Sequence, residues 1–337
     1  MEQVISLKNV NIYCISVHRH GYFFLLLASA KHPRKVLVPG ILVIVLLACG
    51  ILNLRIITDP VELWAAPESR SRIEKDYFDK NFEPFYRTEQ IIITAKNLPN
   101  VYHNTSDGLT SFGPIFNKNF MYAILDLQER IEAIVGEEGE SLQDVCFKPL
   151  EPKNNNCTIF SIWGYWQNQR ELLNKTAGNG DNYLDHFKFC TKNPAAPKDS
   201  TQLHLSCLGE YGGPIFPSVV VGGFLKDYSA GNLDPPYHDA NTAIITFVVE
   251  NHFDKKEIKN ALEWEKAFVS FMKNYTKNEM PEFMEIAFNS ERSIEDELAR
   301  ESEGEVSTIV ISYLIMFAYI SVSLGEVASF KRLFVRS

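Results

Sequence analysis

The sequence lacks the short motifs that mark common catalytic and nucleotide-binding sites. It has no G-x-S-x-G elbow, no H-E-x-x-H pair, no Walker A loop and no EF-hand pattern. The glycine-rich stretch GEYGGPIFP contains Pro214 and no lysine, so it predicts tight turns and not a phosphate cradle. Acidic neighbours such as Glu295 and Asp296 predict solvated charge on a helix. We therefore expect no enzymatic activity, no cofactor and no bound metal.

Positive charge is outnumbered by negative charge in the middle of the chain. Residues 55–305 hold 25 of the 33 Lys and Arg residues but 40 of the 42 Asp and Glu residues. This negative excess argues against a nucleic-acid partner. The two ends are basic by contrast, and the positive-inside rule then predicts that residues 1–35 and 326–337 are cytoplasmic while 55–305 lie on the far side of a membrane.

Charge is absent altogether from two long segments, 36–54 and 308–325. A helix of 18 residues at the usual rise covers roughly 27 Å, close to the hydrocarbon thickness of a bilayer. We predict transmembrane helices at 36–54 and 306–325. One alternative is a pair of buried core helices. Another concerns the start of the chain, where Ala28-Ser29-Ala30 follows a short apolar run and matches a signal-peptide cleavage pattern.

Cysteine is rare, with six in the chain, and four of these fall within 55–305. An even number outside the cytoplasm predicts disulfides, and the short separations favour Cys146 with Cys157 and Cys190 with Cys207. Each bridge should contribute about 3 kcal/mol. The alternative is a metal site that uses His186, one helical turn before Cys190, but no CxxC motif or second histidine supports it.

Four N-x-[ST] sequons also fall in this middle part, and they agree with the same placement outside the cytoplasm. Their asparagines are Asn104, Asn156, Asn174 and Asn274.

Alternating and helical patterns in the middle part predict an α+β domain. Strands are expected at 87–95, 241–251 and 282–290, where β-branched and aromatic residues concentrate. Apolar residues recur at steps of three and four after Phe116 and again after Asp254, which predicts two core helices. The order favours a split βαβ sandwich.

Residues 141–207 look like an irregular insertion that the disulfides staple to the main body. An acidic helix beginning near Ser293 leads into the second predicted span.

Seven sequence blocks carry a family resemblance: TDPVELW, RTEQ, SLQDVCFKPL, NNNCTIF, CLGEYGGPIFP, WEKAF and ERSIEDELARES. In this order, and with these cysteine separations, they resemble the middle luminal domain of the Niemann-Pick type C intracellular cholesterol transporter family, part of the resistance-nodulation-division permease superfamily that includes Patched. The resemblance runs from about residue 30 to residue 337. Residues 306–325 resemble the first helix of a sterol-sensing domain.

The resemblance implies a docking function in late endosomes or lysosomes. In this family, two protruding loops of the middle luminal domain dock a small soluble sterol carrier, which passes cholesterol to an N-terminal sterol-binding domain. The matching segments here are 102–112 and 180–185. The docking residues are then expected to be Tyr102, His103, Asn104, Tyr183 and Leu184. The chain departs from the family in two ways: the second segment has fewer aromatic residues, and Asn104 begins a sequon where the family has Pro and Tyr.

The expected partners are therefore the soluble luminal carrier, cholesterol indirectly, membrane lipid, and the N-terminal sterol-binding domain of a full-length transporter. The chain reads as a fragment, truncated isoform or partial gene model, and it is expected to dock the carrier without transporting sterol by itself. Three alternatives remain open: a membrane-anchored receptor or adhesion domain that uses the same loops, a luminal enzyme, and an intestinal sterol-uptake paralogue.

Overall fold

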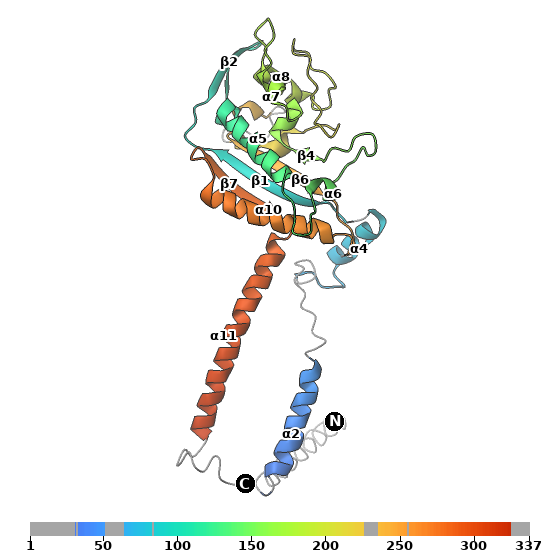
Figure 1. Cartoon of the computed structure of the whole chain (residues 1–337), viewed down its shortest axis with the longest axis vertical. Helices are drawn as coiled ribbons and strands as arrows, with labels where there is room; N and C mark the ends of the chain where they lie inside the picture. Colours follow the sequence, from blue (N-terminus) through green and yellow to red (C-terminus); the bar gives the residue numbers. More distant parts are fainter. Residues whose placement is uncertain are drawn as a thin grey trace, which may run out of the picture. The chain divides into compact units, whose positions relative to one another are not determined.

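The computed structural model describes residues 31, 33–50, 64–82, 84–225, 235–254 and 256–324. The chain divides into two compact units, Met1–Ile57 and Thr58–Ser337. In the first unit the structure describes helix α2 (Pro33–Ala48), an apolar helix with Pro39 inside it. All other elements belong to the second unit (Figure 1).

A five-stranded antiparallel sheet forms the centre of the second unit. Its strands run in the order β4-β6-β1-β7, and β5 pairs with β6. The bounds are β1 (Arg87–Ala95), β4 (Ile159–Phe160), β5 (Val221–Gly222), β6 (Thr242–Val249) and β7 (Met284–Ser290). With α5 between β1 and β4 and α10 between β6 and β7, this is the split βαβ arrangement. The predicted α+β class is confirmed.

The sheet has one apolar face and one more polar face, because side chains alternate along each strand. On β1, Ile91 and Ile93 are fully buried, whereas Gln90 and Ile92 point to the opposite side and are exposed. Helix α10 (Lys259–Asn278) packs on the buried face. Two aromatic contacts fix it there, with ring centroids 6.4 Å apart for Phe247–Trp264 and 6.3 Å for Phe268–Phe288. Figure 1 shows α10 lying along β1 and β7.

The second long core helix, α5 (Lys118–Glu132), follows the predicted periodicity. The side chain of Asn117 caps its start by accepting a hydrogen bond from the Asn119 amide, as N-cap residues commonly do. Its buried stripe contains Phe120, Ile124, Leu127 and Ile131, the residues that the three-and-four spacing predicts. The one-turn helix η2 (Pro114–Phe116) leads into it.

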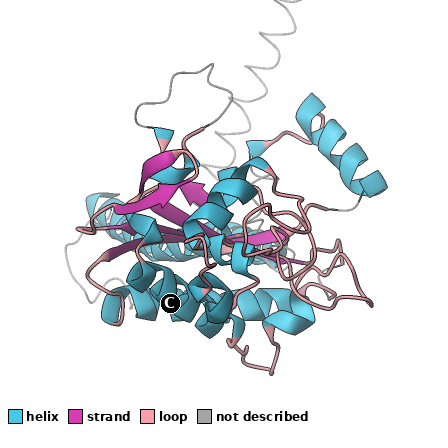
Figure 2. Ribbon diagram, turned by 90° about the horizontal axis from the view of Figure 1, so that it is seen from above, coloured by secondary structure: helices cyan, strands magenta, loops and turns pink. Residues whose placement is uncertain are grey.

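Residues 141–225 form a segment of short elements, which we call the stapled segment. The predicted disulfides Cys146–Cys157 and Cys190–Cys207 are both present, with Cα atoms 5.5 and 5.3 Å apart. The segment is more ordered than the predicted irregular insertion, because it contains several short helices. Figure 2 shows helices and loops packed around the strands of the second unit. The helices of the stapled segment are α6 (Leu142–Val145), η3 (Ile162–Trp166), α7 (Arg170–Asn174), α8 (Tyr183–Lys192) and α9 (Pro217–Val220).

A two-stranded hairpin contains β2 (Val101–Thr105) and β3 (Gly108–Phe112), and η5 (Tyr237–Asp239) precedes β6. Helix α4 (Arg70–Phe82) precedes β1.

Helix α11 (Ser293–Leu324) runs without a break from the acidic segment into the apolar one, as predicted. Among the helices in the described ranges, none combines the length and the apolar character needed to cross a bilayer. The two membrane spans therefore stay predictions. Residues 51–54 and 325 of those spans lie outside the described residues, as do the possible cleavage site at 28–30 and the tail at 326–337.

Candidate functional site

The first predicted docking segment, 102–112, is the β2–β3 hairpin. Its strands pair from Val101 with Phe112 to Thr105 with Gly108. Gly108 has φ of +104°, which glycine tolerates because it has no Cβ, and this permits the tight turn. The outer face of the hairpin is the exposed one: the side chains of Tyr102 and Leu109 are 68% and 74% exposed.

The second predicted segment, 180–185, is not a projecting loop but the start of α8. Asn182 is the N-cap of this helix and forms a capping box with Asp185. Tyr183 and Leu184 fall in the first helical turn and point into the core, where they are only 5% and 1% exposed. The expectation that they project from a loop is therefore wrong. The phenol of Tyr183 instead donates a hydrogen bond to the Phe116 carbonyl at 2.8 Å.

The structure joins these two segments directly. His103 Nε2 lies 2.7 Å from Asp185 Oδ2, and both side chains are largely shielded from solvent. Asn182 Nδ2 lies 3.2 Å from His103 Nδ1, and its Oδ1 accepts from the Leu184 amide. Since the Asn182 oxygen is committed to the helix cap, its NH₂ group faces the imidazole. His103 Nδ1 then accepts from Asn182, while Nε2–H donates to Asp185.

A second link closes the tip of the hairpin against α8. Lys188 Nζ lies 2.8 Å from Asp107 Oδ2 and donates to Thr105 Oγ1 at 3.2 Å. The hydrogen bond from the Lys188 ammonium lowers the pKa of the Asp107 carboxyl below its ordinary value. The hairpin, the N-terminal turn of α8 and these links form one continuous surface, which we call the hairpin–α8 surface.

A hollow of about 400 Å³ lies in this surface. Thr105, Ser106 and Asp107 of the hairpin tip line part of it. Residues of the 179–181 turn, α8 and positions 200–201 line the rest, and all of these are polar except Phe189. Its charged groups are of both signs, so it suits a polar projection of a protein partner better than an apolar ligand.

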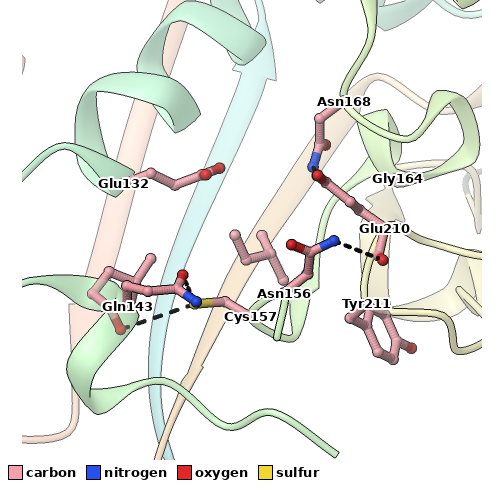
Figure 3. A pocket seen from close by; sticks show the side chains of 10 residues that line it. Glu132, Gln143, Asn156, Cys157, Gly164, Asn168, Glu210 and Tyr211 are labelled. Atoms are coloured by element: carbon pink, nitrogen blue, oxygen red, sulfur yellow. Dashed lines mark hydrogen bonds between the residues drawn. The ribbon is translucent and has the colours of Figure 1, made fainter. Parts of the chain in front are cut away.

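A smaller hollow of about 130 Å³ lies between the end of α5 and the stapled segment (Figure 3). Two carboxylates line it, Glu132 and Glu210. Burial raises the pKa of the Glu132 carboxyl, an effect that a hydrogen bond from Gln128 opposes. Asn168 donates to the Glu210 carboxylate at 2.9 Å. Each carboxylate thus accepts a hydrogen bond from an amide side chain.

The residues of the alternative metal site do come together, since His186, Cys190 and Cys207 are close neighbours and all buried. Both sulfurs belong to the Cys190–Cys207 disulfide, so neither is available as a thiolate ligand. Both ring nitrogens of His186 are also engaged: Nδ1 lies 2.6 Å from Asp199 Oδ2, and Nε2–H donates to the Tyr165 carbonyl at 2.8 Å. The geometry is that of a structural histidine beside a disulfide.

A buried charged cluster lies where β1 meets α10. The guanidinium of Arg87 makes a bidentate pair with the Glu265 carboxylate, with Nη2 to Oε2 at 2.8 Å. Glu89 is fully buried on the same face of β1 as Arg87. Among the described residues, no cation pairs with Glu89 as Arg87 pairs with Glu265. Burial raises the pKa of Glu89 to about 9, and the nearby Glu265 carboxylate adds to the rise. Burial also raises the pKa of the Glu265 carboxyl, although its hydrogen bond with Arg87 opposes this rise. At neutral pH Glu89 is therefore a neutral acid beside the Arg87–Glu265 pair.

Sequence reasoning missed two features of the hairpin–α8 surface. Leu109 was not singled out, although the alternation on both sides of the Ser106-Asp107-Gly108 turn predicts a hairpin with Leu109 facing the same side as Asn104. The bond between His103 and Asp185 joins residues 82 positions apart, and no local pattern predicts it. The asparagines of the four sequons are all exposed, as their prediction as modification sites requires.

These features define a disulfide-stabilised α+β domain of split βαβ topology. A sequence model of the family described as "NPC1, middle luminal domain" matches residues 75–292, and the chain belongs to this family.

The chain is similar to curated proteins whose names describe cholesterol transporters. It is 42% identical over 317 residues to the NPC intracellular cholesterol transporter 1 of Sus scrofa, covering 91% of this chain and 24% of the relative. It is 38% identical over 319 residues to homolog 1b of that transporter in Drosophila melanogaster, covering 92% of this chain and 24% of the relative. The NPC1-like intracellular cholesterol transporter 1 of Rattus norvegicus is 38% identical over 326 residues, at 91% and 24% coverage. The chain thus spans about a quarter of the length of these relatives.

Proposed function

We propose that this domain docks a soluble luminal sterol carrier, and so takes part in transferring cholesterol out of late endosomes or lysosomes. The observation that carries the proposal is the bond between His103 and Asp185. It joins the two segments that the family resemblance selects for docking, although they are far apart in the sequence. The names of the relatives, all intracellular cholesterol transporters, support the same function.

The side chains that contact the carrier are those that project from the hairpin. Tyr102 and Leu109 are exposed on its outer face. A tyrosine presented on a rigid support is well suited to an interface, because it buries a large area and loses little conformational entropy. Tyr183 and Leu184 act beneath the surface, where they anchor the first turn of α8 and so keep Asp185 in reach of His103.

The proposal includes the membrane topology. Residues 36–54 and 306–325 span the membrane, 55–305 are luminal, and 1–35 and 326–337 are cytoplasmic. The lack of charge in both spans and the two disulfides support this topology, because disulfides persist in oxidising compartments outside the cytosol. Membrane lipid and the N-terminal sterol-binding domain of a longer transporter are then the remaining partners.

The proposal also separates docking from transport. These residues correspond to about a quarter of each relative, so they dock the carrier and leave sterol movement to the remainder of a full-length transporter. Sterol efflux from lysosomes of transporter-null cells that express this chain alone would contradict this part.

Docking is tested by pull-down of a sterol-loaded carrier at acidic pH with the full chain in detergent. Replacing Tyr102 and Leu109 together by Ala should weaken binding by about 2 kcal/mol, roughly thirtyfold. The matched control is Phe253→Ala, which removes an exposed aromatic side chain outside both the hairpin and α8. Equal binding by the double variant and the control would contradict the assignment of the surface, and no binding by the unchanged chain would contradict docking itself.

A further inference from the structure

The four sequon asparagines differ in what their amide nitrogens do. In three of them Nδ2, the atom that would carry a sugar, already donates a hydrogen bond to the protein: Asn156 to the Glu210 carbonyl at 3.2 Å, Asn174 to the Arg170 carbonyl at 3.0 Å, and Asn274 to the Glu279 carboxylate at 3.0 Å. Asn104 is exposed, and among the described residues its side chain makes no hydrogen bond. A glycan at Asn104 therefore displaces no native contact.

Asn104 also occupies a particular place on the hairpin. Along β2 its side chain points to the same outer side as that of Tyr102, because strand side chains alternate, and His103 points inward. Across the hairpin Asn104 is paired with Leu109. Directly opposed residues of this kind have Cβ atoms about 5 Å apart. The sequon thus lies between the two exposed apolar side chains of the hairpin–α8 surface.

We propose that Asn104 carries an N-linked glycan, and that this glycan covers the outer face of the hairpin and weakens docking there. In the modification, Nδ2 forms a bond to the anomeric carbon of an oligosaccharide supplied on a lipid diphosphate. The bond from that carbon to the diphosphate oxygen breaks, the lipid diphosphate leaves, and the amide loses one proton. The second part of the proposal, the effect on docking, rests on the proposed function.

The physical reason for weakened docking is steric and polar at once. A hydrated sugar between Tyr102 and Leu109 keeps a partner from reaching either side chain, and the binding energy of a tyrosine depends on its complete desolvation. The glycosylated chain would have to bind through the hairpin tip and the hollow beside α8 alone. The fraction of chains that carry a glycan at Asn104 then determines how much of the hairpin–α8 surface is available to a carrier.

Occupancy is measured on the full chain produced in the secretory pathway of eukaryotic cells. Digestion with an N-glycosidase converts each glycosylated Asn to Asp, which mass spectrometry of the peptides detects. Asn104 should be converted, and Ser106→Ala should abolish this conversion while Ser106→Thr retains it, since both variants keep Asn104 itself. An unconverted Asn104 in the unchanged chain would overturn the proposal and leave the proposed docking function intact.

The effect on docking is measured with the same pair of variants and the sterol-loaded carrier. Ser106 itself lines the hollow, so the two variants are first compared without glycan, from cells treated with an inhibitor of N-glycosylation, and they should then bind alike. With glycosylation intact, Ser106→Ala, which lacks the glycan, should bind about tenfold more tightly than Ser106→Thr, which has it. Adding Tyr102→Ala and Leu109→Ala to both variants should remove that difference. If Asn104 is occupied and the two variants bind equally, the shielding is refuted. If neither binds although Asn104 is occupied, the proposed docking function has failed and the shielding with it, while the modification stands.

Discussion

The sheet with its covering helices and the stapled segment both satisfy buried backbone groups, but they do so by different means. In the sheet, regular pairing of β1 with β6 and β7 satisfies the backbone groups, and the side chains are free to form a dense core. That core even accommodates charged residues: Glu265 and Glu89 are fully buried, and Arg87 is only 8% exposed.

The stapled segment has few regular elements, so side chains bind many of its backbone carbonyls. The phenol of Tyr165 donates to Ile215 O at 2.9 Å, Gln167 Nε2 donates to Leu208 O at 2.8 Å, and His186 Nε2 donates to Tyr165 O at 2.8 Å. Buried carbonyls need such partners when no ladder supplies them. Two disulfides add covalent constraint. The sheet should therefore unfold when its buried charge is unbalanced, and the stapled segment when its disulfides are removed.

The largest effect is expected from unbalancing the charged cluster of the sheet. Glu265→Ala leaves the Arg87 guanidinium buried without its bidentate partner, and this should lower the free energy of unfolding by about 3–5 kcal/mol. Urea unfolding of the full chain in detergent measures the loss.

A matched double variant shows whether the cost comes from the lone charge. Replacing Arg87 and Glu265 together by Met removes both charges and keeps the volume, so most of the lost stability should return. A double variant as unstable as Glu265→Ala would show that the pair itself, and not the uncompensated cation, stabilises the sheet.

A somewhat smaller loss is expected from the stapled segment. Cys190→Ala with Cys207→Ala removes a bridge between two fully buried residues 17 positions apart and should cost about 3 kcal/mol. Hydrogen exchange should speed up mainly at amides of the stapled segment, including η3, while the amides of β1 stay protected. Equal loss of protection in both regions would contradict the distinction between them.

The sheet was largely predictable because its signals are local and strong. The run Ile91-Ile92-Ile93 marked β1, and regular spacing from Phe120 to Ile131 marked α5. The cysteine pairs followed from their separations. The start of α8 was misread because the glycine and asparagine residues before it resemble an open loop. The capping box of Asn182 with Asp185 was its available signal, and the contact with His103 depends on tertiary packing alone.

The pH dependence of stability should come from the sheet cluster. Folded Glu89 holds its proton until about pH 9, whereas the ordinary value is 4.5, so the folded state binds one more proton than the unfolded state between these limits. The contribution of the Glu89 proton to the free energy of unfolding is fully present below about pH 4.5. It is lost as the pH rises toward about 9, by at most about 1.4 kcal/mol per pH unit.

Glu89→Gln keeps the shape and removes the titrating proton, so its unfolding free energy should vary less with pH than that of the unchanged chain. Thermal or urea unfolding across this pH range gives the two slopes. Glu171→Gln on exposed α7 is the control and should leave the slope unchanged. A Glu89→Gln variant with the original slope would place the titrating group elsewhere.

The smallest expected effect distinguishes Tyr183 from Tyr102, both of which the sequence predicts as docking residues. Tyr183→Phe removes only the hydrogen bond to the Phe116 carbonyl and should cost about 1 kcal/mol of stability, without changing carrier binding beyond that loss. Burial raises the pKa of the Tyr183 phenol to about 12, so spectrophotometric titration should show one fewer late-titrating tyrosine in the variant. Tyr102→Phe, on the exposed hairpin, should leave stability unchanged. Tyr183 acts from inside the core, whereas Tyr102 acts from the surface. If Tyr183→Phe bound the carrier more weakly at unchanged stability, the docking contact would have to be assigned to α8 and not to the hairpin.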